Sequence, residues 1–144
     1  MFAEAMIGGV LIADAFIDTG SAISLLSTAL HSRLPSAPVI QPFTAAAVDV
    51  VGVGGASAVI RGYIDAPVEL DRITVHNLLL VADGLAFTLL IGMDVLRPHG
   101  ATLSFGGDPV RLRTRVCNVC CETRTELPVK FQSTSLCAPS PRRA

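Results

Sequence analysis

The chain has 144 residues, of which 51% are hydrophobic and 16% are charged, and it contains no tryptophan. This length fits a single domain with a substantial core, and the net charge of −1 gives no overall basis for binding nucleic acid. No stretch reaches the roughly 18–20 apolar residues that a membrane-spanning helix needs. From the charge and from this absence of long apolar stretches, we expect the domain to bind neither nucleic acid nor a membrane.

Charge and cysteine are unevenly distributed along the chain. Residues 1–112 carry 5 basic and 10 acidic groups, whereas residues 113–144 carry 6 basic and 2 acidic groups and all four cysteines (Cys117, Cys120, Cys121 and Cys137). We therefore predict a folded domain over 1–112 and a flexible tail or linker over 113–144. A Cys-x2-Cys pair could form half a zinc site, but the tail has no histidine, so we expect no metal and no cofactor. A body without cysteine favours a cytoplasmic setting.

The first elements predicted along the chain are strands. Two strands within Met6–Ile17 turn at Gly8-Gly9, and the second of them delivers Asp18 to a turn of Thr19, Gly20 and Ser21. Ile23–Leu30 follows as another strand, with a possible helical turn at its end. An aspartate in a turn after a strand is common, so this turn alone is weak evidence of function.

The middle of the chain predicts a hairpin with a glycine-rich tip. Ala45–Val51 and Ala58–Ile64 are rich in β-forming residues, and they flank Gly52, Val53, Gly54 and Gly55. Pro67–Leu70 and Ile73–Ala82 are expected to form two further strands.

The last part of the domain predicts one short helix among strands. Phe87–Ile91 is a buried strand that ends at Gly92, and Met93–Arg97 is the helix, with Asp94 in its first turn. Ala101–Phe105 and Val110–Leu112 complete the strands. Many short strands separated by turns indicate an all-β domain.

Three separated motifs give the sequence a family resemblance. They are Asp18-Thr19-Gly20, the glycine-rich hairpin, and Leu89-Leu90-Ile91-Gly92, which follows Asp18 at a characteristic distance along the chain. Together they resemble the motifs of the retropepsins, the aspartic proteases of retroviruses and LTR retrotransposons. The resemblance runs from about Ile7 to Leu112. It implies a single-lobe acid-protease barrel with a flap hairpin and one short helix, in which two lobes arise by homodimerisation.

The resemblance also implies a mechanism. Hydrolysis of a peptide bond by carboxylates needs two of them sharing one proton, and this chain has one Asp-Thr-Gly. The second carboxylate is therefore expected from Asp18 of a second copy. Thr19 would lock the two turns together, and Gly20 would allow a close backbone approach. The expected catalytic residues are Asp18, Thr19 and Gly20.

The same resemblance assigns substrate-binding residues. Ser21 would hydrogen-bond the carboxylate, the flap would close over a bound peptide, and pocket positions fall in the strands around the site. The expected residues are Ser21, Gly52, Val53, Gly54, Gly55, Thr88 and Leu90, with Phe16 and Leu25 equally well explained as core. Retroviral enzymes pair an arginine with an aspartate at the positions of Met93 and Ala22, so both partners are missing here.

The function expected from these features is that of an aspartic endopeptidase. The homodimer would cut a retrotransposon polyprotein, in the cytoplasm or within retroelement particles. Two alternatives remain open: a dimerisation or peptide-binding module that keeps the fold without general activity, and a host-domesticated protease with one dedicated substrate.

Overall fold

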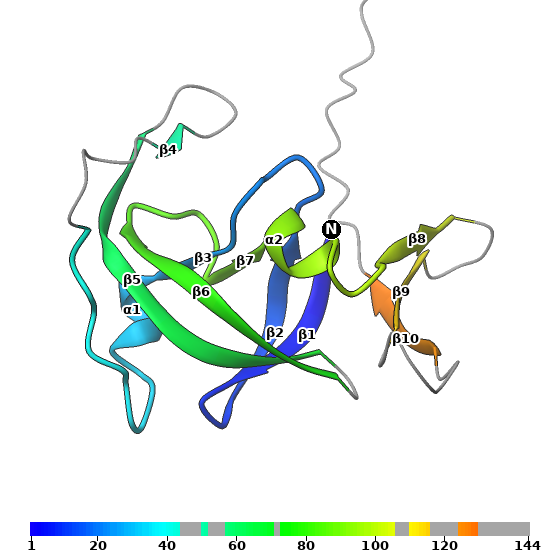
Figure 1. The fold of residues 1–144 in the computed structure, drawn as a ribbon, viewed down its shortest axis with the longest axis horizontal. Coiled ribbons are helices and arrows are strands. Elements are labelled where there is room, and N and C mark those ends of the chain that lie inside the picture. The colour runs from blue at the N-terminus through cyan, green and yellow to red at the C-terminus, as the bar shows by residue number, and fades with distance from the viewer. Residues whose placement is uncertain (44–49, 52–56, 71–72, 106–109, 116–123, 130–144) are drawn as a thin grey trace, which may run out of the picture.

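A computed structural model describes residues 1–43, 50–51, 57–70, 73–105, 110–115 and 124–129 (Figure 1). The flap tip and the four cysteines of the tail lie outside these residues, so the predictions made for them remain predictions. The two helices that the structure describes have four residues each, and no described helix is long and apolar enough to cross a membrane.

The first hairpin forms where the sequence predicts it. β1 (Phe2–Ile7) and β2 (Val10–Ile17) pair antiparallel, with Ile7 opposite Val10. Gly8 and Gly9 make the turn with φ of 55° and 79°, a backbone conformation that residues with a Cβ rarely adopt.

A short strand and a helical turn come next. β3 (Leu25–Ser27) leads directly into α1 (Thr28–His31), and the Ser27 hydroxyl caps the helix by accepting a hydrogen bond of 3.1 Å from the Leu30 amide. The helical turn expected at the end of Ile23–Leu30 is α1, so the described residues contain one short helix more than the family resemblance implies.

The central hairpin is longer than expected. β4 (Val50–Val51) pairs with the start of β5 (Ser57–Leu70), and β5 pairs with β6 (Ile73–Asp83) along its length. The two strands predicted on either side of residues 65–66 are thus one strand. Pro67 is accommodated opposite His76, in a stretch where β5 pairs with β6 alone.

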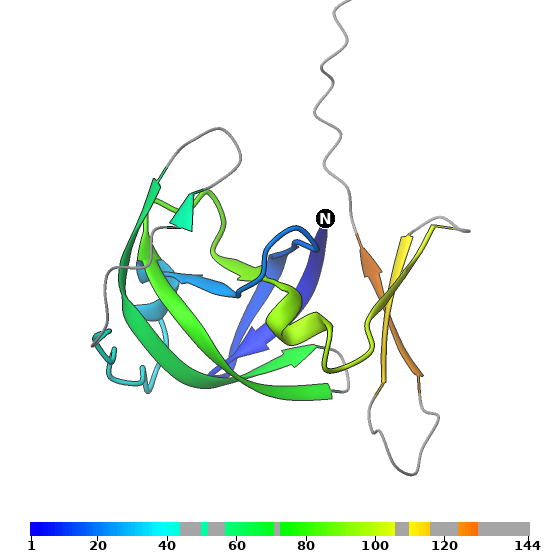
Figure 2. The ribbon, with the colours of Figure 1, turned by 45° about the horizontal axis from the view of Figure 1, so that its top comes forward.

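The strands close into a barrel (Figure 2). β7 (Leu89–Ile91) lies between β2 and β3, and the order β1-β2-β7-β3-β6-β5 returns to β1, with β4 added to β5. Alternate residues of each strand point into the barrel. The residues that do so are apolar, and they form the barrel interior. The largest fully buried side chains of the barrel strands are Ile7, Ile17, Leu26, Ile64, Val68, Leu70, Leu79, Val81, Leu89 and Ile91.

A second, three-stranded sheet follows α2 (Met93–Leu96). It consists of β8 (Thr102–Ser104), β9 (Val110–Arg115) and β10 (Arg124–Val129), all antiparallel (Figure 1). The domain boundary predicted after Leu112 therefore falls inside β9, and the segment predicted to be a flexible tail contributes β10. Strand pairing thus continues past the change in composition, and the division into domain and tail remains a prediction.

Candidate active site

Asp18 lies immediately after β2, in a turn tied to the neighbouring strand. β2 and β7 are parallel, with Ile17 opposite Ile91, and the Asp18 amide continues the ladder by donating to the Ile91 carbonyl at 3.0 Å. The Gly20 amide donates to Asp18 Oδ1 at 2.9 Å. The carboxylate is thus held by its own turn, half-buried, while Thr19 and Gly20 are exposed.

The rest of the turn rests on the start of α2. The Met93 amide donates to the Ser21 carbonyl at 2.8 Å. A Cβ on Gly92 would lie 2.4 Å from the Ile23 carbonyl oxygen, so only glycine permits this contact. The Ser21 hydroxyl donates to the Ile23 carbonyl at 2.7 Å. Its single proton is therefore used there, and the expected donation from Ser21 to Asp18 is not made.

One sheet face beside Asp18 is apolar. Strand pairing places Phe16 and Leu25 opposite Leu90, and Leu25 opposite Leu80, so these side chains share a face. Leu90 is 5% exposed. Three of the four predicted pocket positions (Phe16, Leu25 and Leu90) are thus brought together, and Phe16 precedes Asp18 by two residues in the chain.

Aromatic rings extend this face, and two of them are not among the residues predicted from the sequence. Phe16 stacks on Phe87 with ring centroids 4.4 Å apart and contacts Phe2 at 5.2 Å. Phe2 and Phe87 are distant from Phe16 in the sequence, so only the pairing of β1, β2 and β7 reveals the cluster. All three rings are partly exposed, as expected for the wall of a binding groove.

Thr88 and the residues of the predicted flap are the remaining predicted binding residues. The Thr88 carbonyl accepts a hydrogen bond of 2.9 Å from the Ser27 amide. The Thr88 hydroxyl is buried and has no partner among the described residues. Gly52, Val53, Gly54 and Gly55 lie outside the described residues, although β4 and the start of β5 flank them as the hairpin prediction requires.

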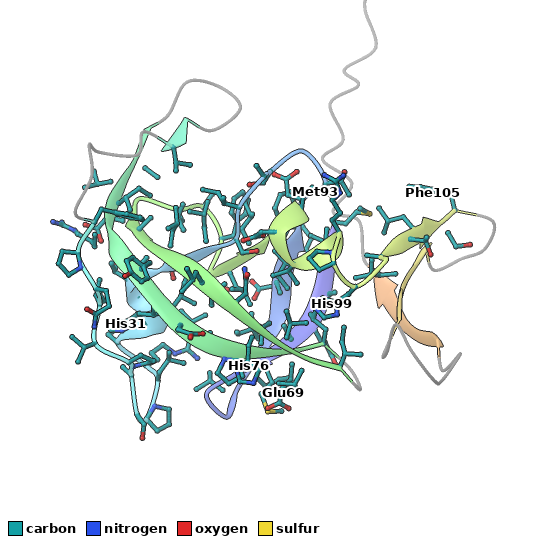
Figure 3. The ribbon with its side chains drawn as sticks, viewed as in Figure 1. His31, Glu69, His76, Met93, His99 and Phe105 are labelled. Carbon is teal, nitrogen blue, oxygen red and sulfur yellow. The ribbon has the colours of Figure 1, made fainter. Side chains whose placement is uncertain are left out.

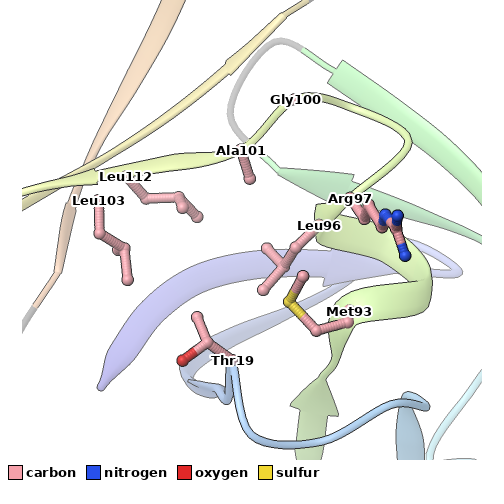
Figure 4. A pocket seen from close by; sticks show the side chains of 8 residues that line it. All are labelled: Thr19, Met93, Leu96, Arg97, Gly100, Ala101, Leu103 and Leu112. Carbon is pink, nitrogen blue, oxygen red and sulfur yellow. The ribbon is translucent and has the colours of Figure 1, made fainter.

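A cavity of about 350 Å³ lies beside Thr19 of the turn (Figure 4). Its lining combines Thr19 with apolar side chains of α2 and the second sheet: Met93, Leu96, Ala101, Leu103 and Leu112, together with Gly100 and Arg97. Thr19 thus faces a cavity that it shares with α2 and the second sheet.

The electrostatics of the site are simple. Burial lowers the pKa of the Met1 amino group, and the nearby negative charge of Asp18 opposes that shift. Among the described residues, no second carboxylate shares a hydrogen-bond partner with Asp18. Nor do they contain a group of three or more His, Cys, Asp or Glu side chains that could hold a metal ion.

Comparisons with solved structures identify the same fold. The retroviral protease-like domain of Ddi1 from Leishmania major has 21% sequence identity and a TM-score of 0.64, covering 93% of this chain and 96% of that domain. EIAV protease, solved with the inhibitor HBY-793, has 24% identity and a TM-score of 0.55, covering 73% of this chain and 92% of the enzyme. The predicted all-β retropepsin-type barrel is confirmed.

Comparisons of sequence identify the family. No curated protein sequence matches the chain. A family model described as "gag-polyprotein putative aspartyl protease" matches residues 3–98, which include the Asp18 turn, the barrel strands and α2. The chain therefore belongs to the gag-polyprotein aspartyl protease family and has a retropepsin-like fold.

Proposed function

We propose that the protein is an aspartic endopeptidase that acts as a homodimer, with Asp18 of each copy at the shared site. The observation that carries the proposal is the Asp18 turn, fixed to β7 and to its own Gly20 amide, with Thr19 and Gly20 exposed beside it. One such turn per chain supplies one carboxylate, and a second copy related by a two-fold axis supplies the other.

The chemistry follows from two carboxylates that hold one proton between them. The ionised carboxylate takes a proton from water, whose oxygen attacks the carbonyl carbon of the peptide bond. The protonated carboxyl group donates to the carbonyl oxygen. Transfer of a proton to the nitrogen then lets the amine leave, giving a new carboxyl terminus and a new amino terminus without a covalent intermediate.

The apolar face beside Asp18 favours an extended peptide with large apolar side chains. Phe16, Phe87 and Leu90 offer aromatic and aliphatic surface there. A peptide would bind as an added strand between this face and the flap. The family description supports a gag polyprotein as the substrate. For such a substrate we expect the reaction in the cytoplasm or in retroelement particles.

The surface near Thr19 is the proposed contact with the second copy. Thr19 is exposed, and the adjoining cavity is lined mainly by apolar side chains of α2, β8 and β9. Phe105, just after β8, is 67% exposed (Figure 3). Apolar surface next to half of a catalytic site fits a self-association interface.

Replacement of the carboxylate tests the proposal. Asp18→Asn should reduce cleavage of a mixed peptide library by at least about 10³-fold, because an amide cannot act as the base. The variant should keep the circular dichroism spectrum of the wild type. Asp14→Asn is the matched control, since Asp14 is exposed on the same strand, and it should retain activity.

Two results would refute the proposal. Undiminished cleavage by Asp18→Asn would exclude Asp18 as the catalytic base. Peptide binding by a folded wild-type protein that cleaves nothing at acidic or neutral pH would favour the binding-module alternative.

A further inference from the structure

The Asp94 carboxylate is the centre of a hydrogen-bond network behind the catalytic turn. Its Oδ1 accepts from the Ser24 hydroxyl at 2.7 Å and from the Val95 amide at 3.0 Å. Its Oδ2 accepts from the Asn77 side-chain amide at 2.8 Å and from the Ser24 amide at 3.0 Å. Four donors from three chain segments therefore converge on one carboxylate, and such charge-assisted bonds are the stronger ones in proteins.

Ser24 is the second centre of the network, and it is completely buried. Its hydroxyl donates to Asp94 and accepts from the Gly92 amide at 2.9 Å, and its carbonyl accepts from the Leu80 amide at 3.1 Å. Every polar group of Ser24 is thus bonded. Removing Asp94 would leave two buried Ser24 donors without their acceptor, which is costly.

The network continues to the catalytic carboxylate through the backbone. Gly92, held by Ser24, stands between Ile91 and Met93 in the chain. The Ile91 carbonyl accepts from the Asp18 amide at 3.0 Å, and the Met93 amide donates to the Ser21 carbonyl at 2.8 Å. Both ends of the catalytic turn are therefore attached to the short segment that Asp94 and Ser24 fix in place.

Among the residues that the structure describes, no cation takes part in this attachment. Positions 22 and 93, where the family resemblance implies an ion pair, are alanine and methionine. In the described part of the chain the recorded salt bridge joins Arg61 to Asp83, away from this network. Neutral donors, in particular Ser24 and Asn77, are what satisfy Asp94.

We propose that Asp94 is a positioning residue for catalysis, acting through Ser24 and Asn77 to fix the turn that carries Asp18. The inference rests on the proposed peptidase function. Asp94 does not contact the reacting atoms. Its role is to hold the Asp18 carboxylate in the orientation that the partner carboxylate and the water require, since small displacements of catalytic groups reduce rates strongly.

Asp94→Asn tests the positioning role, because the new amide group would place hydrogens opposite the donors of Ser24 and Asn77. We expect kcat per folded dimer to fall by at least about tenfold, with KM changing by less than about twofold. Asp65→Asn is the matched control, because Asp65 is exposed on β5, and it should leave both constants unchanged.

Exchanging the residues at positions 77 and 94 tests whether kcat can be rescued. A purely structural role of Asp94 would not give this recovery of kcat. Combining Asp94→Asn with Asn77→Asp restores a donor opposite an acceptor between these two positions. The double variant should regain at least about a third of the kcat lost by Asp94→Asn, and the double-mutant cycle should show coupling. Asn77→Ala removes only one of the four bonds, so it provides a folded variant if Asp94→Asn does not fold.

A second measurement separates this inference from the proposed function. Amide hydrogen exchange should be faster at Gly20 and Gly92 in Asp94→Asn than in the wild type, whether or not the protein cleaves peptides. An inactive wild type would refute the proposed function alone. Unchanged kcat per folded dimer, or unchanged exchange at both glycines, would refute the positioning role of Asp94.

Discussion

At the scale of single residues, three carboxylates of this protein differ in the groups that donate hydrogen bonds to them. Asp18 is held within its own turn, Asp94 by donors from three segments, and Asp83 by one hydroxyl and one guanidinium. The Thr28 hydroxyl donates to Asp83 at 2.7 Å, and Arg61 Nε donates to it at 2.6 Å. These bonds connect β5 and β6 to the start of α1.

The pKa of Asp83 predicts a dependence of stability on pH. The hydrogen bond from Thr28, followed by the bond from Arg61, lowers this pKa below its ordinary value of 3.8. A carboxylate with a lowered pKa in the folded state stabilises the fold above its unfolded pKa, and this contribution is lost as the pH falls through the folded value. Asp83→Asn should therefore lower Tm near neutral pH, by at most a few degrees for a largely exposed pair.

Thermal unfolding at a series of pH values checks this prediction. The Tm difference between wild type and Asp83→Asn should be constant above about pH 5 and shrink below pH 4. Asp65→Asn, with an exposed carboxylate on β5, serves as the control. A Tm difference that grows on acidification would contradict the assigned direction of the shift.

At the scale of elements, the second sheet belongs to the core of the domain. Leu112 on β9 is 1% exposed and joins the same hydrophobic cluster as the barrel residues. Leu103 on β8 packs against this cluster. The strands β8 and β9 are therefore part of the folded unit, although the sequence composition changes within β9.

Truncation of the Leu112 side chain measures this contribution. Leu112→Ala should lower the free energy of unfolding by about 2–5 kcal/mol, because it removes a fully buried side chain and leaves a cavity. Leu11→Ala is the matched control, since Leu11 is 60% exposed on β2, and it should cost less than about 0.5 kcal/mol. Equal losses for the two variants in urea unfolding would show that β9 does not pack on the barrel.

Local sequence patterns predicted turns better than they predicted long-range contacts. The Asp18 turn and the Gly8-Gly9 hairpin were recognisable because neighbouring residues determine them. The role of Asp94 was missed, since Ser24 and Asn77 lie 70 and 17 residues away in the sequence. In the sequence, the favourable interaction of a carboxylate with the dipole of α2 already explains an aspartate at position 94. No local pattern connects Asp94 with Ser24 and Asn77.

At the scale of the whole molecule, the proposed function gives each chain half of a catalytic site. The barrel closes on itself, with β1 pairing with both β2 and β5, so the strands that carry Asp18 leave no free edge there. In the proposed dimer, the contacts with the second copy come instead from the exposed Thr19, the apolar cavity beside it and the exposed Phe105. Because the barrel already closes within one chain, the proposed function needs the second copy for the second carboxylate.

Activity should therefore depend on protein concentration. Cleavage per mole of chain is expected to rise with concentration until the dimer dominates, as mass action requires. An excess of Asp18→Asn chains should inhibit the wild type, because each mixed dimer holds only one competent carboxylate, whereas an excess of Asp14→Asn chains should not. Sedimentation velocity over the same dilution series measures the dimer fraction directly. Specific activity should follow that fraction, since monomers keep the Asp18 turn but lack the second carboxylate. Constant specific activity in samples that sediment as monomers would mean that one chain completes the site alone.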